Sequence, residues 1–538
     1  MLPFIYWFCY NEVYINNNTG REAQLMEYAV ALKHVTKTFG KVVANRDVSL
    51  DIRKGEILSL LGENGSGKTT LMNMIAGIYY PDQGEIFING KLAEIRSPRD
   101  AYNLGIGMIH QHFKLIDVFT AAENIALGLD KSEKFDLKKI RQKAMEICDR
   151  YHFDLNIDQK VYEMSVSQKQ TLEIVKVLYR GADILILDEP TAVLTPQETE
   201  RLFQVIRNMK ADNKSVIIIT HKLHEVLEIS DRVAILRKGE YVGMVDTKEA
   251  TESSLTEMMV GKKVSLNIER SEPVNPVKRL SVSNLTVYNK ENVKILDNVS
   301  FDAYGGEILG IAGISGNGQK ELLESVAGLQ VTAEGSSIKF YEKGRENAPM
   351  ELVGKTPKKI RDTGVHLAFV PEDRLGMGLV GSMGMTGNML LKSYGNGHSV
   401  LTDMKAPTKL AEKVKEELEV VTPSINTPVS RLSGGNVQKV LVGREIAEKP
   451  TVLMTAYAVR GLDINTSYTI YNLLNEEKKQ GAAVIYVGED LDVLIDLCDR
   501  ILVLCGGKAN GIVDGRSVTK EEVGLLMTNL KKGGAGNE

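Results

Sequence analysis

The chain of 538 residues has one tryptophan, four cysteines and no excess of positive charge. Cys9, Cys148, Cys498 and Cys505 show neither metal-ligand nor redox spacing, which excludes a recognisable disulfide framework and favours reduced thiols. A net charge of -4 gives no electrostatic signature of nucleic-acid binding, so we expect no nucleic-acid partner. No apolar run is long enough to span a bilayer. The length predicts two to four domains rather than a single core.

The two ends of the chain carry little structural signal. The first ten residues, MLPFIYWFCY, are apolar but lack the basic start and the small-residue cleavage site of a secretory signal. The polar run NNNTGREAQ follows, and strand-like sequence resumes only at Met26. We expect residues 1–25 to be a disordered extension or the product of an upstream misassigned start, with a membrane-surface anchor as the alternative. Residues 531–538 are expected to form a tail.

The stretch ILSLLGENGSGKTT, residues 57–70, is the strongest local signal in the first half. An apolar, strand-like run enters a glycine-rich turn, and a helix-like segment follows. In such a turn backbone N–H groups converge on phosphate oxygens, and the next helix points its positive end at the same place. A glycine turn with a chance lysine is the alternative, but the flanking strand and helix argue against it. The expected nucleotide-binding residues here are Gly62, Asn64, Gly65, Ser66, Gly67, Lys68, Thr69 and Thr70.

Further polar residues follow predicted strands downstream. ADILILDEP ends in Asp188 and Glu189, placed to hold Mg²⁺ and to activate the attacking water, 120 residues after Lys68 (188 − 68). Taken alone, this pair could simply end a strand. Gln111 in GMIHQHF and His221 in IIITHKL also stand after strand-like segments, where single polar caps are common. The ordered set indicates a site for nucleotide hydrolysis.

The alternation of strands and helices predicts an α/β fold with a parallel sheet, and this pattern occurs twice. GEIL at 55–58 returns at 306–309, an offset of 251 that grows to 268 near the end of each copy. About 17 additional residues are therefore expected in the second copy, between about 330 and 400. The predicted domains are 26–262 and 279–530, joined by a linker at 263–278.

The motifs of the first copy, Gly62 to Thr70, Gln111, Ser165 to Gln170, Asp188-Glu189 and His221, stand in a characteristic order. The second copy contains LSGGN at Leu432 to Asn436. The chain resembles tandem ATP-binding-cassette (ABC) ATPases from Met26 to about residue 530. The resemblance implies two phosphate-loop domains, each with a mixed sheet, helices and a helical subdomain. ATP and Mg²⁺ are the implied cofactors.

The resemblance also assigns roles to individual residues. It implies that Glu189, His221 and Gln111 are catalytic, and that Thr69, Gln111 and Asp188 hold the metal. Phe39 is expected to stack on adenine, with a core phenylalanine as the alternative. In this family two domains pair head to tail, so Ser433, Gly434 and Gly435 are expected to complete the site of the first phosphate loop.

The second copy has lost its own catalytic set. Gln319 and Lys320 stand where Lys68 and Thr69 are expected, and Ala456 and Tyr457 replace the Asp-Glu pair. Glu372 and Glu489 occupy the positions of Gln111 and His221, where an anionic side chain would repel a triphosphate. The signature of the first copy, MSVSQKQ, has Val166 and Ser167 in place of two glycines. We therefore expect one competent composite site and one degenerate site.

The phrases VPEDR, LSGGNVQK, RGLD and GMIHQHFKLIDVFTAAENIALG resemble the ATPase subunits of importers for nucleosides and simple sugars, including ribose and galactose. That branch implies two membrane permease subunits, an extracytoplasmic solute-binding lipoprotein, and a location on the cytoplasmic face of the membrane. Residues 112–165 would receive a permease helix, or be an ordinary helical subdomain. The alternatives are a tandem cassette acting on ribosomes, which usually keeps both sites, and an inactive regulatory scaffold.

Overall fold

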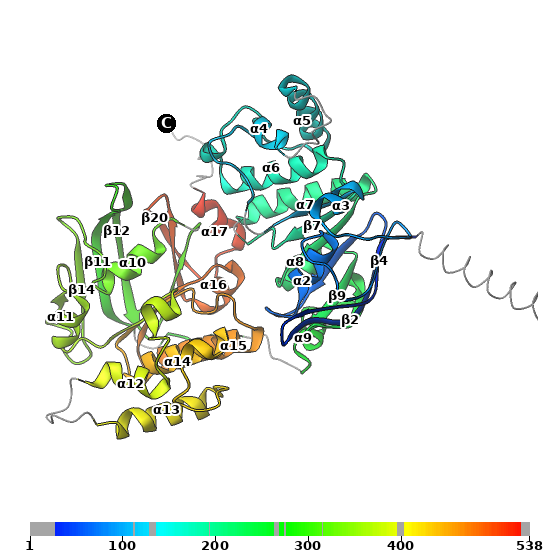
Figure 1. Cartoon of the computed structure of the whole chain (residues 1–538). Coiled ribbons are helices and arrows are strands. Elements are labelled where there is room, and N and C mark those ends of the chain that lie inside the picture. Colours follow the sequence, from blue (N-terminus) through cyan, green and yellow to red (C-terminus); the bar gives the residue numbers. More distant parts are fainter. Residues whose placement is uncertain are drawn as a thin grey trace, which may run out of the picture. The chain divides into compact units, whose positions relative to one another are not determined.

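The computed structural model divides the chain into two compact units, Met1–Ser265 and Leu266–Glu538 (Figure 1). It describes residues 27–110, 113–127, 136–192, 194–262, 268–273, 276–314, 316–394 and 403–528. The predictions for residues 1–25, Gln111 and residues 531–538 lie outside this described part. Within the described part, no helix combines the length and the apolar composition needed to cross a membrane.

The first unit alternates strands with helices. Its strands are β1 (Tyr28–Phe39), β2 (Val42–Arg53), β3 (Ile57–Leu61), β4 (Gln83–Ile88), β5 (Lys91–Leu92), β6 (Ile106–Ile109), β7 (Ile184–Asp188), β8 (Ser215–Ile219), β9 (Arg232–Arg237) and β10 (Glu240–Asp246). Its helices are α2 (Lys68–Ile75), α3 (Pro98–Asn103), α4 (Ala121–Ala126), α5 (Leu137–Tyr151), η1 (Val161–Glu163), α6 (Val166–Tyr179), α7 (Pro196–Ala211), α8 (Leu223–Ile229), η2 (Thr247–Glu249) and α9 (Glu252–Val260).

The central sheet of the first unit has the strand order β10-β9-β3-β8-β7-β6. Every residue of β3 and β8 is buried, because α2, β1 and β2 pack on one face of the sheet and α6 and α7 on the other. Pairing between β6, β7, β8, β3 and β9 is parallel, and only β10 runs antiparallel. Since parallel strands end at the same edge, the loops after β3, β7 and β8 meet there.

A second, antiparallel sheet and a helical lobe complete the first unit. The antiparallel sheet has the order β2-β1-β4-β5. Figure 1 shows α4, α5 and α6 gathered in one lobe, drawn in cyan, which has its own core around Ile125, Ile140 and Leu172. The helical subdomain that the resemblance implies thus corresponds to α4, α5 and α6, with η1 between α5 and α6. The predicted mixed α/β fold with a helical subdomain is confirmed.

The second unit repeats this arrangement. Its strands are β11 (Val277–Tyr288), β12 (Lys294–Gly305), β13 (Ile308–Ala312), β14 (Ser337–Phe340), β15 (Met350–Glu351), β16 (Leu367–Val370), β17 (Val452–Ala456), β18 (Ala483–Val487), β19 (Arg500–Cys505) and β20 (Lys508–Asp514). Its helices are α10 (Gln319–Val326), α11 (Pro357–Asp362), η3 (Arg374–Gly378), α12 (Met385–Ser393), α13 (Lys405–Glu417), η5 (Val429–Arg431), α14 (Gly434–Ala447), α15 (Ile464–Lys479), α16 (Leu491–Leu497) and α17 (Lys520–Met527).

The two units share one topology, since the sheet order β16-β17-β18-β13-β19-β20 matches that of the first unit strand for strand. The offset between equivalent elements is 251 at α2 and α10 (319 − 68), 259 at α3 and α11 (357 − 98) and 268 at α5 and α13 (405 − 137). The additional residues therefore lie between α10 and α13, in the predicted region, and are divided among several connections. Loops accept such additions with little disturbance of the core.

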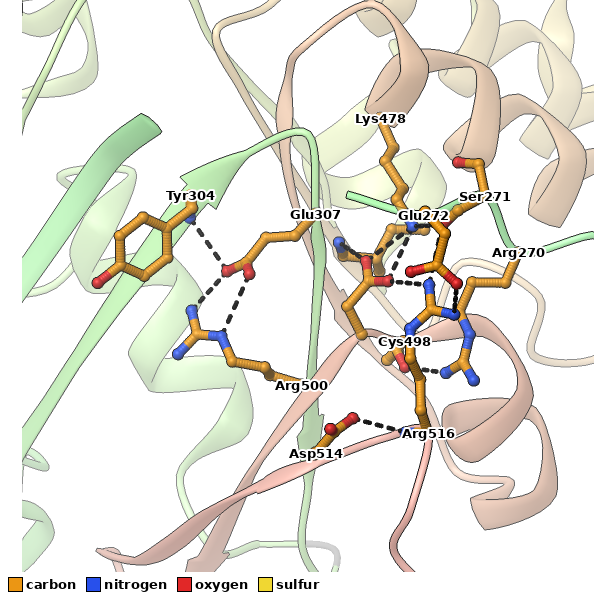
Figure 2. A network of polar contacts seen from close by, with 12 residues as sticks. Arg270, Ser271, Glu272, Tyr304, Glu307, Lys478, Cys498, Arg500, Asp514 and Arg516 are labelled. Atoms are coloured by element: carbon orange, nitrogen blue, oxygen red, sulfur yellow. Dashed lines mark hydrogen bonds and ion pairs between the residues drawn. The ribbon is translucent and has the colours of Figure 1, made fainter. Parts of the chain in front are cut away.

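Residues 268–273 fall inside the predicted linker, 263–278, but they bind to the second unit (Figure 2). Arg270 donates to the main-chain carbonyls of Ile495, at 2.9 Å, and Cys498 near the end of α16. The Lys478 ammonium and the Arg516 guanidinium both donate to the carbonyl of Ser271. Residues 277 and 278 are already part of β11. Part of the predicted linker, residues 268–273, is therefore held on the second unit by these side chains.

Docking of this segment coincides with the burial of an ion pair that both units contain. In the first unit Lys210 and Asp231 pair at 2.5 Å, with side chains 40% and 37% exposed. The equivalent pair in the second unit, Lys478 and Asp499, lies at 2.9 Å with side chains only 1% and 4% exposed. Lys478 also contacts residue 271 of the docked segment. The same two residue types are therefore a surface pair in one unit and a buried pair in the other.

This difference in burial predicts unequal effects of matched substitutions. Lys478→Met leaves the buried Asp499 carboxylate with less compensation and should lower the free energy of unfolding by about 3 kcal/mol. The control, Lys210→Met, should cost less than about 1 kcal/mol because water solvates the exposed Asp231. Equilibrium urea unfolding of the full chain measures both values. Equal losses of unfolding free energy in the two variants would show that burial of the ion pair does not change its contribution to stability.

Candidate functional site

The glycine-rich loop between β3 and α2 requires its glycines for steric reasons. A Cβ atom on Gly62 would lie 2.3 Å from the carbonyl oxygen of Leu236. Gly67 has φ +95°, and a Cβ atom there would lie 2.4 Å from the carbonyl oxygen of Ala44. Gly65 is also left-handed, at φ +80°, and is open to solvent with Asn64. The backbone can adopt this tight curve only because no side chains stand at these points.

Lys68 and Ser66 give the loop its polar character. The Lys68 side chain is buried, and its ammonium donates to the carbonyls of Gly62 at 2.6 Å and Glu63 at 3.0 Å. Burial lowers the pKa of Lys68. The Ser66 hydroxyl is buried and has no hydrogen-bond partner among the described residues. An unpartnered buried hydroxyl beside a lysine and the start of a helix fits a phosphate group.

Asp188, at the end of β7, meets the start of α2. The Thr69 side chain approaches the Asp188 carboxylate. Burial, followed by the neighbouring charge of Glu189, raises the pKa of Asp188 to about 6. Thr70, the next residue of α2, is half-buried. A hydroxyl and a carboxylate in contact form the oxygen donor set that Mg²⁺ prefers, so the residues present fit this ion.

Glu189 is held by its backbone and by His221. It has φ +47°, a left-handed conformation, and its N–H donates to the carbonyl of Ile219 at 2.9 Å. Its carboxylate lies 3.1 Å from Nδ1 of His221, and this hydrogen bond is the main cause that lowers the pKa of Glu189. The carboxylate is therefore kept ionised and aimed by a residue from the neighbouring strand end.

Phe39 ends β1 and is 43% exposed, which rules out the alternative of a core phenylalanine. Its ring meets the ring of Tyr79 edge to face, with centroids 5.1 Å apart. The Lys37 ammonium lies 5.6 Å from the Phe39 ring centroid. The exposed ring is thus oriented by two neighbours, and stacking of a base on it stays a prediction.

The two signature segments begin their helices differently. In the first unit Ser165 caps α6: its hydroxyl accepts from the N–H of Gln168 at 3.2 Å, and Gln168 bonds back to the Ser165 N–H. In the second unit Ser433 makes no such cap on α14, and its hydroxyl instead accepts from the Asn436 amide at 2.8 Å. The first N–H groups of α14 therefore carry no side-chain cap, as a helix end that binds an anion requires.

The second unit keeps the shape of the nucleotide loop without its charges. Gln319 replaces Lys68 and is equally buried, and its amide donates to the carbonyl of Ile314 at 3.1 Å, the counterpart of the Lys68 contact to Glu63. Tyr457, which replaces Glu189, has φ +50° and donates its N–H to Val487 at 2.9 Å. The backbone is thus alike in the two units, while uncharged side chains stand at these two positions of the second unit.

Arg460 joins the two glutamates that replace Gln111 and His221. Its guanidinium contacts Glu372 at 2.5 Å and Glu489 at 3.1 Å. The repulsion that we expected between these carboxylates and a triphosphate is therefore reduced by an internal cation. A cavity of about 360 Å³ beside them is lined by Lys320, Glu324, Phe369, Pro371, Glu372, Asp373, Met377 and Ala456. Sequence reasoning singled out RGLD, which contains Arg460, but missed these ion pairs, because pairing across three loops leaves no local motif.

Within the first unit, Lys68, Thr69, Asp188, Glu189 and His221 lie at one edge of the central sheet. Gln111 lies outside the described residues. This loop, fold and carboxylate pair define a phosphate-loop ATPase. A family model described as "ABC transporter" matches residues 45–192 and 296–455, more than half of the chain. The chain belongs to the ABC transporter family: it binds ATP, and its hydrolysis of ATP is coupled to transport.

Curated relatives match over nearly their whole length. The chain is 40% identical to the nucleoside import ATP-binding protein NupA of Lactococcus lactis over 93% of this chain and 98% of the relative. It is 40% identical to the guanosine import ATP-binding protein NupO of Bacillus subtilis, over 95% and 99%. The ribose import ATP-binding protein RbsA of Clostridium tetani is 35% identical, over 91% and 96%.

The contrast between the two loops predicts different effects of matched substitutions. Lys68→Ala removes a buried cation from the phosphate loop and should weaken ATP binding at least about tenfold. Gln319→Ala, at the equivalent buried position, should leave the ATP dissociation constant within about twofold, because no charge is lost. Isothermal titration of the full chain with ATP measures both. A large loss of affinity in Gln319→Ala would place ATP in the second loop as well.

Proposed function

We propose that the chain is the ATPase subunit of an importer for nucleosides or simple sugars. The names of NupA, NupO and RbsA, which match more than nine-tenths of this chain, support this substrate class. As in importers of that kind, the partners are two permease subunits in the membrane and an extracytoplasmic solute-binding lipoprotein. The subunit then works at the cytoplasmic face of the membrane, which it reaches through the permeases.

We propose further that the chain has one competent ATP site, completed across its two repeats. The observation that carries this proposal is the distribution of the intact motifs. The loop with Lys68, the Asp188-Glu189 pair and His221 are intact in the first repeat, whereas the signature with Ser433 and Gly434 is intact in the second. If the repeats act head to tail, the intact parts fall together in one site and the substituted parts in the other.

In this site Lys68 and the loop N–H groups hold the outer phosphates, Phe39 supports the base, and Ser433, Gly434 and Gly435 approach the terminal phosphate. Thr69 and Asp188, whose side chains approach each other, would hold Mg²⁺, with Gln111 as the third proposed contact. When bound, Mg²⁺ supplies neutralisation of the charge that develops on the phosphate oxygens.

Hydrolysis depends on a correctly placed base. The Glu189 carboxylate, kept ionised by its bond to His221, orients the attacking water in line with the terminal phosphate and accepts its proton. His221 fixes the direction of the carboxylate and can contact the phosphate with its other ring nitrogen. The second repeat lacks this base, since Tyr457 stands in its place, so it serves as a structural partner or a weak nucleotide holder.

The importer proposal predicts the partners found by co-purification. A tagged full chain, extracted from native membranes with mild detergent, should carry polytopic permease proteins with it. Lys68→Ala should retain them, because docking to a permease does not require the phosphate-loop lysine. Mass spectrometry of the eluted complex provides the measurement. Ribosomal proteins in place of permeases would refute the importer and favour the ribosome-bound alternative.

The composite site predicts an effect of the second repeat on hydrolysis. Gly434→Asp introduces a carboxylate where the terminal phosphate is proposed to lie, and should lower kcat at least about 100-fold by charge repulsion. A helix start accepts aspartate well, so folding is expected to be retained. The matched control, Val166→Asp at the equivalent position of the first repeat, should keep at least half of the activity. Steady-state phosphate release distinguishes the two, and the reverse order would contradict this composite site.

A further inference from the structure

Thr191, Lys222 and Glu225 form a largely buried polar cluster next to Glu189 and His221 along the chain of the first unit. The Thr191 hydroxyl donates to the Glu225 carboxylate at 2.6 Å. The Lys222 ammonium donates to the same carboxylate at 3.0 Å and to the carbonyl and hydroxyl oxygens of Thr191 at 3.2 and 3.3 Å. Thr191 and Glu225 are only 2% and 4% exposed.

The cluster connects the two chain segments that carry the proposed catalytic pair. Thr191 is two residues after Glu189, in the loop that follows β7, and Lys222 is the residue after His221, in the loop that follows β8. Between them, the carbonyl of Pro190 accepts a buried hydrogen bond of 2.6 Å from Gln170. Pro190, which follows Glu189, is thus held by the buried side chain of Gln170. Lys222, which follows His221, is held by the buried side chain of Glu225.

The second unit provides an internal comparison, because all three cluster residues are replaced there. The equivalents are Val459, Asp490 and Val493, at the offset of 268 that also relates Asp188 to Ala456 (459 − 191, 490 − 222, 493 − 225 and 456 − 188). The two valines pack against the core of that unit. Gln438, the equivalent of Gln170, is fully buried and neither amide atom has a hydrogen-bond partner among the described residues. The network is absent where the catalytic residues are absent.

We propose that Thr191, Lys222 and Glu225 are positioning residues that hold the Glu189 carboxylate and His221 in the geometry required for hydrolysis. This inference rests on the proposed role of Glu189. The fold does not need the network, since the second unit forms the same strands, with the same left-handed turn at Tyr457, around two valines. A buried ion pair is also a poor source of stability compared with apolar packing. The network instead accounts for the orientation of the Glu189 carboxylate, because a small displacement of a reacting group lowers the reaction rate strongly.

The test is removal of one hydroxyl at constant volume. Thr191→Val, which installs the residue of the second unit, should lower kcat for ATP hydrolysis about tenfold and leave KM for ATP within about twofold. Thr191→Ser keeps the hydroxyl and should restore at least half of the wild-type kcat. The matched control is Thr256→Val, because Thr256 is fully buried in α9 and its hydroxyl donates only to the carbonyl of Glu252 at 2.7 Å. This control should keep the wild-type kcat.

A double substitution separates this inference from the proposed catalytic role. Glu189→Gln alone should abolish steady-state turnover with ATP binding retained, and full turnover in this variant would refute Glu189 as the base. In single-turnover measurements, Thr191→Val should cause no further loss in the Glu189→Gln background if it acts through the carboxylate. Multiplicative losses in the double variant, or a wild-type kcat in Thr191→Val while Glu189→Gln is inactive, would overturn the positioning role and leave the proposed function standing.

Discussion

Parallel hydrogen bonding between β3, β8 and β7 is the constraint on which the site depends. The register places Leu60 of β3 and Asp188 of β7 both opposite Ile219 of β8, so these three strands end level with one another. Main-chain pairing therefore brings the phosphate loop, the carboxylate pair and His221 to the same edge of the sheet, whatever side chains they carry. Local sequence then decides what stands at each strand end.

The two units show how far this framework is independent of the chemistry that it carries. Both keep the sheet order and a buried side chain that donates to a loop carbonyl, Lys68 in one and Gln319 in the other. What differs is the set of charges at the strand ends and the polar support behind them. In the second unit the pairing of Arg460 with Glu372 and Glu489 compensates the remaining carboxylates internally. The substituted strand ends of this unit thus carry carboxylates that are paired with a cation.

The features that could be predicted from sequence are those encoded within a few neighbouring residues. The phosphate loop around Lys68, the pair after β7 and the repeated α/β pattern all have characteristic spacing, and the fold and family predicted from them are confirmed. The sequence does not show that Ser433 leaves α14 uncapped. That depends on its hydroxyl accepting from the Asn436 amide and not from a main-chain N–H of the helix. The docking of residues 268–273 depends on Arg516 and Lys478, more than 200 positions away, for which no local pattern exists. Comparing the repeats position by position would have revealed the loss of Thr191 and its partners, although not their contacts.

Glu189 after β7 and Tyr457 after β17 both have a left-handed backbone conformation, and their comparison shows where the backbone strain at the site comes from. A bulky side chain at positive φ is disfavoured by roughly 1 kcal/mol or more, and such residues are often taken as strain stored for catalysis. Tyr457 has the same φ as Glu189 within a few degrees, +50° against +47°, and the same N–H bond to the next strand, but it has no base to offer. The sheet, and not the reaction, therefore imposes this conformation. In the first unit the proposed base, Glu189, therefore occupies a position that the architecture strains in either case.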